Sequence, residues 1–119
     1  MQRRDRIIFN KIISETDICT QMLENISLEK FLEDEKLKRA CAMTVINIGE
    51  LVKNLTDETR LKYNHISWKA IAGMRDIAAH AYQTLRMEDV YNTIIMDLPE
   101  LKKELLSILL RLDVDGQEK

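Results

Sequence analysis

Apolar residues recur at helical spacing along most of the chain and predict four long helices. The second predicted helix, over about residues 35–55, has the clearest stripe, with a 4-4-3-4-3 spacing of apolar positions. This spacing places the side chains on one face of a helix. The other helices are predicted over about residues 3–25, from 67 to just past 82, and from about 87 to 112. No segment alternates with a period of two, so the pattern predicts no strands and favours an all-α, up-down four-helix bundle.

Glycine, proline and capping residues refine these boundaries. Ser27 is a predicted N-cap for a short helical turn, and Ser67 for the third helix. Gly49 lies in the middle of the second helix, where it costs about 1 kcal/mol relative to alanine. It indicates either the close approach of another backbone or a merely tolerated glycine. Pro99 lies inside the fourth apolar pattern and should kink that helix or divide it in two.

Length and composition indicate one ordinary globular domain. The chain has 119 residues, three glycines and one proline. We expect a single helical domain over residues 1–113 and a flexible tail over residues 114–119. The net charge of −2 does not predict a strong nonspecific nucleic-acid binder, which is usually basic. Local basic runs, which the simplest interpretation treats as solvated helix faces, contain Arg3, Arg4, Arg6 and Lys11, and Lys36, Lys38 and Arg39.

Cysteine usage and targeting signals favour a cytoplasmic protein. Cys19 and Cys41 lie in apolar stretches and are predicted to be buried free thiols. No Cys or His spacing indicates a metal site. The first residues lack the apolar run of a signal peptide, and no stretch approaches the roughly 18 apolar residues of a membrane span. We therefore expect no membrane association.

Residues 74–82 hold the side chains best suited to chemistry. His80 has Arg75, Asp76 and Tyr82 within two helical turns. Asp76 and His80 are four residues apart and share a helix face, where the carboxylate can hold the imidazole. Arg75 and His80 are five apart, about 140° around the axis. They can act on one atom only if the arginine bends over or if a second copy supplies part of the site.

An arginine and a histidine together suit metal-free cleavage of RNA. Histidine can take or give a proton near neutral pH, and arginine can bind a phosphate and stabilise its developing charge. The ribose 2′-hydroxyl would then attack the neighbouring phosphate. Taken alone, the Arg-x4-His spacing is weak evidence, because it also fits a surface arginine beside a partly buried histidine.

The segment Arg75-x4-His80-x-Tyr82 resembles the Arg-x4-His-x-Tyr motif of HepT-like proteins, a branch of the HEPN superfamily. Three further segments are similar to that family: residues 46–50 to its Ile-Gly-Glu segment, residues 66–74 to its lead-in to the arginine, and residues 97–101 to its late Leu-Pro-x-Leu turn. The resemblance covers nearly the whole chain. One departure is Asp76, where many HEPN sequences carry asparagine.

The resemblance implies an endoribonuclease toxin of a bacterial toxin–antitoxin pair. Arg75 and His80 would be the catalytic pair, in a cleft between two protomers of a homodimer, with RNA as substrate and no cofactor. Tyr82 would accept AMP from an MntA-like nucleotidyltransferase antitoxin. Supporting residues at the cleft would be Asp76, Asn47 and Glu50.

Two other functions stay open at this point. The chain could be a noncatalytic helical module that binds nucleotide or substrate for a nucleotidyltransferase, with Arg75 binding a phosphate and His80 doing no chemistry. It could also be a plain helical interaction protein.

Overall fold

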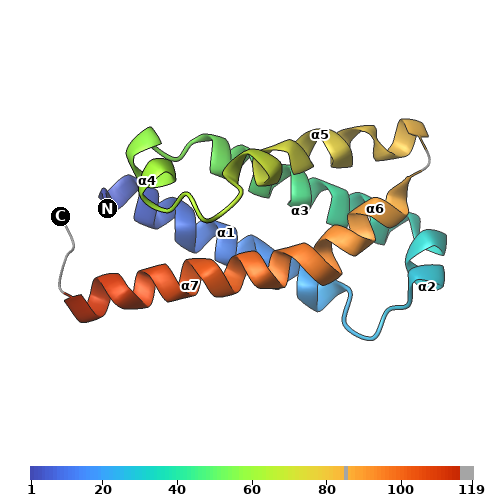
Figure 1. The fold of residues 1–119 in the computed structure, drawn as a ribbon. Helices are drawn as coiled ribbons and strands as arrows, with labels where there is room; N and C mark the ends of the chain where they lie inside the picture. Colours follow the sequence, from blue (N-terminus) through green and yellow to red (C-terminus); the bar gives the residue numbers. More distant parts are fainter. Residues whose placement is uncertain (85, 116–119) are drawn as a thin grey trace.

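The computed structural model describes residues 1–84 and 86–115, and for residues 82–84, 114 and 115 it describes the backbone only. The described residues form helices joined by short connections and contain no strand, which confirms the all-α class (Figure 1). The elements are α1 (Arg3–Met22), α2 (Leu28–Glu33), α3 (Glu35–Lys53), α4 (Asp57–Lys62), α5 (Trp68–Thr84), α6 (Met87–Asn92), the π-helical segment η1 (Thr93–Asp97) and α7 (Leu98–Asp115).

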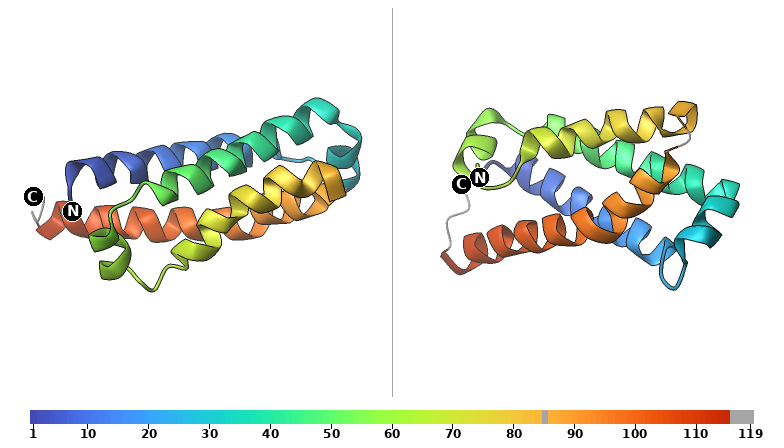
Figure 2. Two further views of the ribbon diagram at one scale, coloured as in Figure 1. Left: turned by 90° about the horizontal axis from the view of Figure 1, so that it is seen from above. Right: turned by 45° about the vertical axis from the view of Figure 1, so that its right-hand side comes forward.

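The four predicted helices correspond to α1, α3, α5 and the run from α6 to α7. Helix α5 packs along α3, α3 packs on α1, and α7 packs on α1, while α6 returns to α5 (Figures 1 and 2). The molecule is elongated, with extents of 47 × 26 × 20 Å. The up-down bundle arrangement itself stays a prediction. The largest fully buried side chains are those of Phe9, Phe31, Ile12, Ile48, Ile94, Leu98, Leu105, Ile108, Val45, Val52, Val90 and Thr16.

Local signals explain where the helices begin and end. The Ser27 side chain accepts a hydrogen bond from the Lys30 backbone N–H at 3.2 Å, which confirms the predicted cap of α2. Asp34 caps α3 in the same way. Asn25 follows α1 with a φ of 61°, a left-handed conformation that asparagine adopts more easily than most residues. The chain therefore turns at Asn25, and α1 ends at Met22, three residues before the expected end.

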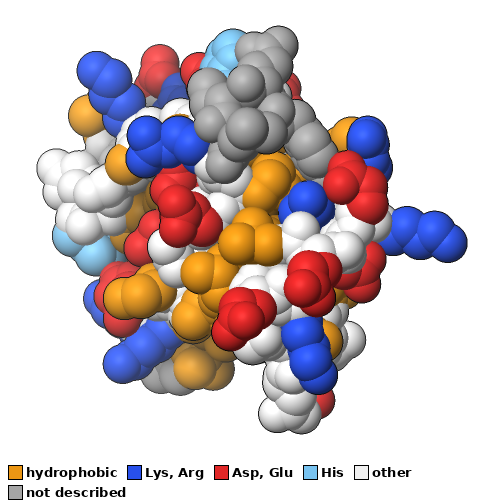
Figure 3. All heavy atoms as spheres, turned by 90° about the vertical axis from the view of Figure 1, so that its right-hand side faces the viewer, with side chains coloured by type: hydrophobic (Ala, Val, Ile, Leu, Met, Phe, Trp, Pro, Cys, Tyr) orange, Lys and Arg blue, Asp and Glu red, His pale blue; other side chains and the backbone are white. Residues whose placement is uncertain are grey.

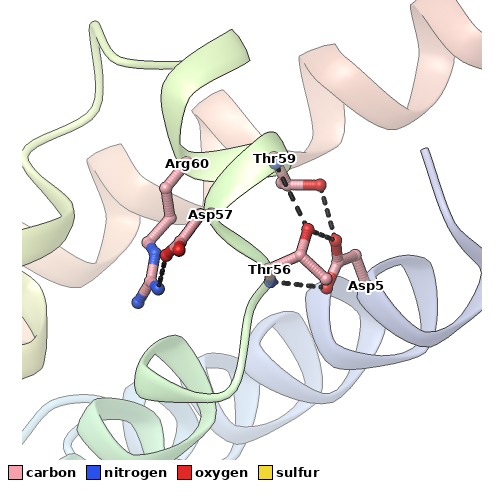
Figure 4. A network of polar contacts seen from close by, with 5 residues as sticks. All are labelled: Asp5, Thr56, Asp57, Thr59 and Arg60. Atoms are coloured by element: carbon pink, nitrogen blue, oxygen red, sulfur yellow. Dashed lines mark hydrogen bonds and ion pairs between the residues drawn. The ribbon is translucent and has the colours of Figure 1, made fainter.

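Helix α4 was not predicted, and a buried carboxylate holds it in place. Asp5 of α1 is fully buried. Its Oδ2 accepts hydrogen bonds from the hydroxyls of Thr56 at 2.5 Å and Thr59 at 2.6 Å, and its Oδ1 accepts one from the Thr56 backbone N–H at 3.1 Å (Figure 4). Thr56 is also the N-cap of α4. The start of α1 thus fixes the position of α4 through one polar cluster.

The electrostatics of Asp5 follow from this cluster. Burial alone would raise the pKa of the Asp5 carboxyl, but the hydrogen bonds from Thr56 and Thr59 outweigh burial, so the pKa lies below its usual value. Hydrogen bonds to a charged group are among the stronger ones in proteins.

The run from α6 to α7 changes its hydrogen-bonding pattern just before Pro99. The Leu98 N–H donates to the Thr93 carbonyl five residues earlier, as in a π-helix. Proline has no N–H, and its ring crowds the carbonyl four residues before it, here that of Ile95. A wider π turn over this carbonyl relieves the crowding. The expected kink at Pro99 stays a prediction.

Both cysteines are buried free thiols, as predicted. Burial raises the pKa of Cys19 to about 12 and that of Cys41 to about 11. Among the described helices, none is long and apolar enough to cross a membrane. Of the predicted tail, residues 114 and 115 continue α7, and residues 116–119 lie outside the described residues.

We predict that Asp5→Asn lowers the free energy of unfolding by about 1–3 kcal/mol at neutral pH, because it removes a charged hydrogen-bond acceptor. Since the folded pKa of Asp5 is depressed, its contribution is complete above the ordinary aspartate pKa of about 3.9 and is lost as the pH falls through the folded value. Urea unfolding at pH 7, 5 and 3 should therefore show the two proteins converging at low pH. Asp57→Asn is the matched control, because Asp57 is 88% exposed and its ion pair with Arg60 lies at the surface. If the unfolding free energies of wild type and Asp5→Asn differ by the same amount at all three pH values, the predicted pH dependence is wrong.

Candidate functional site

Helix α5 carries four of the predicted site residues without interruption: Arg75, Asp76, His80 and Tyr82. Arg75 is partly exposed, and Asp76 and His80 are exposed. Tyr82 lies in the last turn of α5, and its side chain is outside the described residues. A regular helix through this segment supports the 140° angle between Arg75 and His80 that the spacing predicts.

His80 lines an open groove of about 870 Å³ between α5 and the run from α6 to η1. We call this the His80 groove. Asp76 and His80 both line it, as expected for residues four apart on one face. The described lining residues are Asp76, Ile77, His80, Arg86, Asp89, Asn92, Thr93, Met96 and Asp97.

The charges of the His80 groove are mostly negative. Three aspartates line it, against one arginine, Arg86, whose Nε lies 2.9 Å from Asp89 Oδ2. This ion pair offsets part of the positive charge of Arg86. A phosphate that approaches His80 along this groove therefore needs positive charge from elsewhere.

Arg75 does not join this groove but pairs with Glu50 on α3. The Arg75 Nε lies 2.6 Å from Glu50 Oε2. The same oxygen lies 3.9 Å from the Lys53 Nζ and is shielded from solvent. The contact is short, but it lacks the alignment of a hydrogen bond, so it is an ion pair held by charge and proximity. The Arg75 side chain remains 43% exposed.

Gly49 allows α5 to lie this close to α3. A Cβ atom at Gly49 would stand 2.8 Å from the Arg75 Cβ and 3.1 Å from the Ala72 carbonyl oxygen. Real Cβ atoms do not come this near, so no larger residue fits without a shift of α5. The close approach of a second backbone, one of the two readings of Gly49 left open by the sequence, is confirmed.

Glu50 and Asn47 line a second groove, between α1 and α3, which we call the Glu50 groove. Its volume is about 460 Å³. Asn47 Nδ2 donates to Glu15 Oε1 at 3.2 Å, and Asn54 Nδ2 donates to the Glu50 carbonyl at 2.9 Å. The described lining residues are Lys11, Ser14, Glu15, Asn47, Glu50, Leu51 and Asn54.

The structure thus divides the predicted residues into two groups. Arg75 meets Glu50, which shares the Glu50 groove with Asn47, while Asp76 and His80 share the His80 groove. Arg75 is not among the described residues that line the His80 groove, so one chain does not bring the Arg75 and His80 side chains together in that groove. Sequence reasoning missed the part that Glu15 and Lys11 play in the Glu50 groove. The signal was present, because Glu15 interrupts the apolar stripe of α1 at the point where the groove lies.

Several of the basic side chains noted in the sequence are paired. Lys38 and Arg39 both lie 3.3 Å from Glu35, and Arg6 pairs with Asp113. Within the described residues, no three His, Cys, Asp or Glu side chains form a group that could hold a metal ion.

Apolar side chains are exposed beside the His80 groove. Ile77 and Met96, which line it, are 52% and 70% exposed, and Ile95 is 47% exposed. Figure 3 faces the end of the molecule that carries α2 and α6 and shows a band of apolar side chains between acidic and basic ones. Exposed apolar groups that adjoin a groove are typical of an association surface.

Comparison with known proteins gives consistent matches. The sequence profile of the family described as Ribonuclease HepT-like matches residues 12–108. The protein named "Putative RNase TTE0752" of Caldanaerobacter subterraneus subsp. tengcongensis is 39% identical over 98 residues, which are 82% of this chain and 88% of that protein. "Putative RNase MJ1216" of Methanocaldococcus jannaschii is 32% identical over 119 residues, or 99% of this chain and 97% of that protein. "Probable ribonuclease HepT" of Thermococcus cleftensis is 28% identical over 102 residues, or 86% and 93% of the two chains. No solved structure matches the chain.

We predict that the same substitution at two glycines gives proteins of different stability. Gly49→Ala and Gly73→Ala gain similar helix propensity, but only the first places a Cβ against α5, since nothing lies within 4 Å of a Cβ at Gly73. Gly49→Ala should therefore be less stable than Gly73→Ala by about 1–3 kcal/mol, the usual range for overpacking. Chemical unfolding monitored by circular dichroism measures the difference. Equal stabilities would contradict the tight α3–α5 contact.

Proposed function

The chain belongs to the HepT-like ribonuclease family, and on this premise we propose that it is a metal-independent endoribonuclease and the toxin of a bacterial toxin–antitoxin pair. The observation that carries the proposal is the arrangement on α5. An exposed histidine lines an open groove, and an arginine one turn earlier is already held by a carboxylate. These two groups suit general base catalysis and phosphate stabilisation.

In the proposed reaction, His80 takes the proton of a ribose 2′-hydroxyl, whose oxygen attacks the adjacent phosphorus. Arg75 stabilises the negative charge that develops on the phosphate oxygens. The bond from phosphorus to the 5′-oxygen breaks, and that oxygen takes a proton from water. The products are a 2′,3′-cyclic phosphate and a 5′-hydroxyl. Protonated His80 then returns its proton to water.

We further propose that the active form is a homodimer. In one chain Arg75 pairs with Glu50 and does not line the His80 groove, whose one described arginine is paired with Asp89. A second copy related by a two-fold axis can bring its Arg75 to the His80 groove of the first. The exposed Ile77 and Met96 beside this groove provide apolar surface for such a contact.

A second candidate function is a noncatalytic helical partner of a nucleotidyltransferase. One observation favours it: Asp76, Asp89 and Asp97 make the His80 groove acidic, which opposes RNA binding by a single chain. On this view Arg75 binds a phosphate and His80 takes no part in chemistry.

We predict that the purified wild-type protein cleaves single-stranded RNA in the presence of EDTA and leaves a 2′,3′-cyclic phosphate. Arg75→Ala and His80→Ala should each lower the cleavage rate by about 100-fold or more, in keeping with the loss of a charge-stabilising group or a general base. Mass spectrometry of the product ends and circular dichroism of the variants are the measurements. Absence of cleavage by the wild-type protein would favour the noncatalytic alternative. Full activity in His80→Ala would reject His80 as the general base, and activity that requires added magnesium would reject this mechanism.

Mixing the two inactive variants tests the shared site. If each site takes Arg75 from one protomer and His80 from the other, a mixed dimer of Arg75→Ala and His80→Ala has one intact site of its two. Random exchange of equal amounts should restore about a quarter of wild-type activity. If both residues of a site come from one chain, the mixture stays inactive. Scattering measurements at micromolar concentration give the oligomeric state independently.

For control of the toxin, we propose AMP transfer to Tyr82 by an MntA-like nucleotidyltransferase. A phosphodiester two residues after His80 would add negative charge and bulk beside the groove and oppose entry of the RNA backbone. Co-expression with an MntA-like nucleotidyltransferase should add one or more AMP units to Tyr82, seen by mass spectrometry, and abolish cleavage. Tyr82→Phe should remain toxic in the presence of the partner. Equal protection of cells from Tyr82→Phe would show that the partner inhibits by binding.

A further inference from the structure

The Arg75 guanidinium lies against Glu50 of α3. Its Nε lies 2.6 Å from Glu50 Oε2, an oxygen that is shielded from solvent. A carboxylate this close to Nε restricts where the guanidinium can lie, and the Nη groups at the far end of the guanidinium can bind a second partner. A phosphate that binds at the Nη end would therefore meet an arginine that is already oriented.

The backbone beside Glu50 restricts Arg75 in a second way. Gly49 brings the α3 backbone so close that a Cβ there would stand 2.8 Å from the Arg75 Cβ and 3.1 Å from the Arg75 backbone nitrogen. Two consecutive residues of α3 thus act on one residue of α5. Gly49 sets where the Arg75 side chain starts, and Glu50 sets where its guanidinium lies.

We propose that Gly49 and Glu50 form a positioning unit for Arg75, and that Glu50 orients the guanidinium for the transition state at the expense of ground-state RNA binding. The inference rests on the proposed ribonuclease function. Glu50 carries a negative charge next to the phosphate site, so it repels the RNA backbone in the ground state. The same charge holds the arginine in the geometry that the developing phosphate charge requires, and such fixed geometry lowers the barrier.

The kinetic test is Glu50→Gln, which keeps the shape of the side chain and removes its charge. We expect kcat to fall by about 10- to 100-fold, the effect of a small misplacement of a catalytic group, while KM is unchanged or lower. Glu24→Gln is the matched control, because it makes the same change in net charge at an exposed position after α1. It should leave both constants unchanged. A rise in KM with an unchanged kcat in Glu50→Gln would overturn the proposal.

A double-mutant cycle separates positioning from a general structural role. The Arg75→Lys variant lacks the guanidinium Nε that pairs with Glu50. If Glu50 acts through Arg75, Glu50→Gln should therefore change kcat less than twofold in an Arg75→Lys background. A structural defect would reduce kcat by the same factor in both backgrounds, and that outcome would overturn the proposal.

A measurement independent of activity is the nuclear magnetic resonance signal of the Arg75 Nε–H group, identified by its loss in Arg75→Lys. In wild type the ion pair with Glu50 should slow exchange of this proton with water, and in Glu50→Gln exchange should be at least several-fold faster. Lys53→Met, which removes the more distant cation beside Glu50, should leave the exchange rate unchanged. If wild type fails to cleave RNA but shows the slow Arg75 signal, the proposed function fails and the positioning of Arg75 by Glu50 stands. If Glu50→Gln leaves both the signal and kcat unchanged, the positioning role is rejected.

Discussion

The contact of α3 with α5 at Gly49 is the constraint on which the position of the candidate site depends. It brings two helix backbones together at the residue from which the Arg75 side chain leaves α5. The Glu50 carboxylate can meet Arg75 at 2.6 Å only because the axes are this close. The opposite face of α5 is then left for Asp76 and His80, which line a groove toward α6 and η1. Gly49 therefore sets how closely α3 and α5 can pack at the start of the Arg75 side chain.

Much of the fold could be predicted from the sequence, because apolar periodicity reports burial directly. The four long helical segments, the cap at Ser27 and the close approach at Gly49 were all visible as local patterns. Helix α4 was missed because it is short and has too few apolar residues to form a stripe. Its signal was a capping threonine, Thr56, followed by two acidic residues. Nothing in the sequence around Asp5 indicates that its carboxylate is buried, because its partners lie more than 50 residues away.

The spatial grouping of the candidate site residues could be predicted only in part. Helical geometry placed Asp76 with His80 and separated His80 from Arg75, and the structure has this arrangement. The direct partner of Arg75 could not be derived from spacing, because it belongs to another helix and depends on the register between α3 and α5. The charge of the His80 groove could not be predicted from spacing either, because Asp89 and Asp97 come from later segments of the chain.

The π-helical segment η1 affects which face of α6 is turned toward His80. A π turn is an α-helix that has gained one residue, and each residue turns an α-helix by about 100°. The extra residue in Thr93–Asp97 therefore sets the rotational phase of α6 relative to α7. Helix α7 is held by its packing on α1, so the phase decides which side chains of α6, here Asp89 and Asn92, are turned toward His80. In a protein with one residue fewer in this segment, a different face of α6 would be turned toward His80. Its groove would then differ in charge even if every residue type nearby were the same.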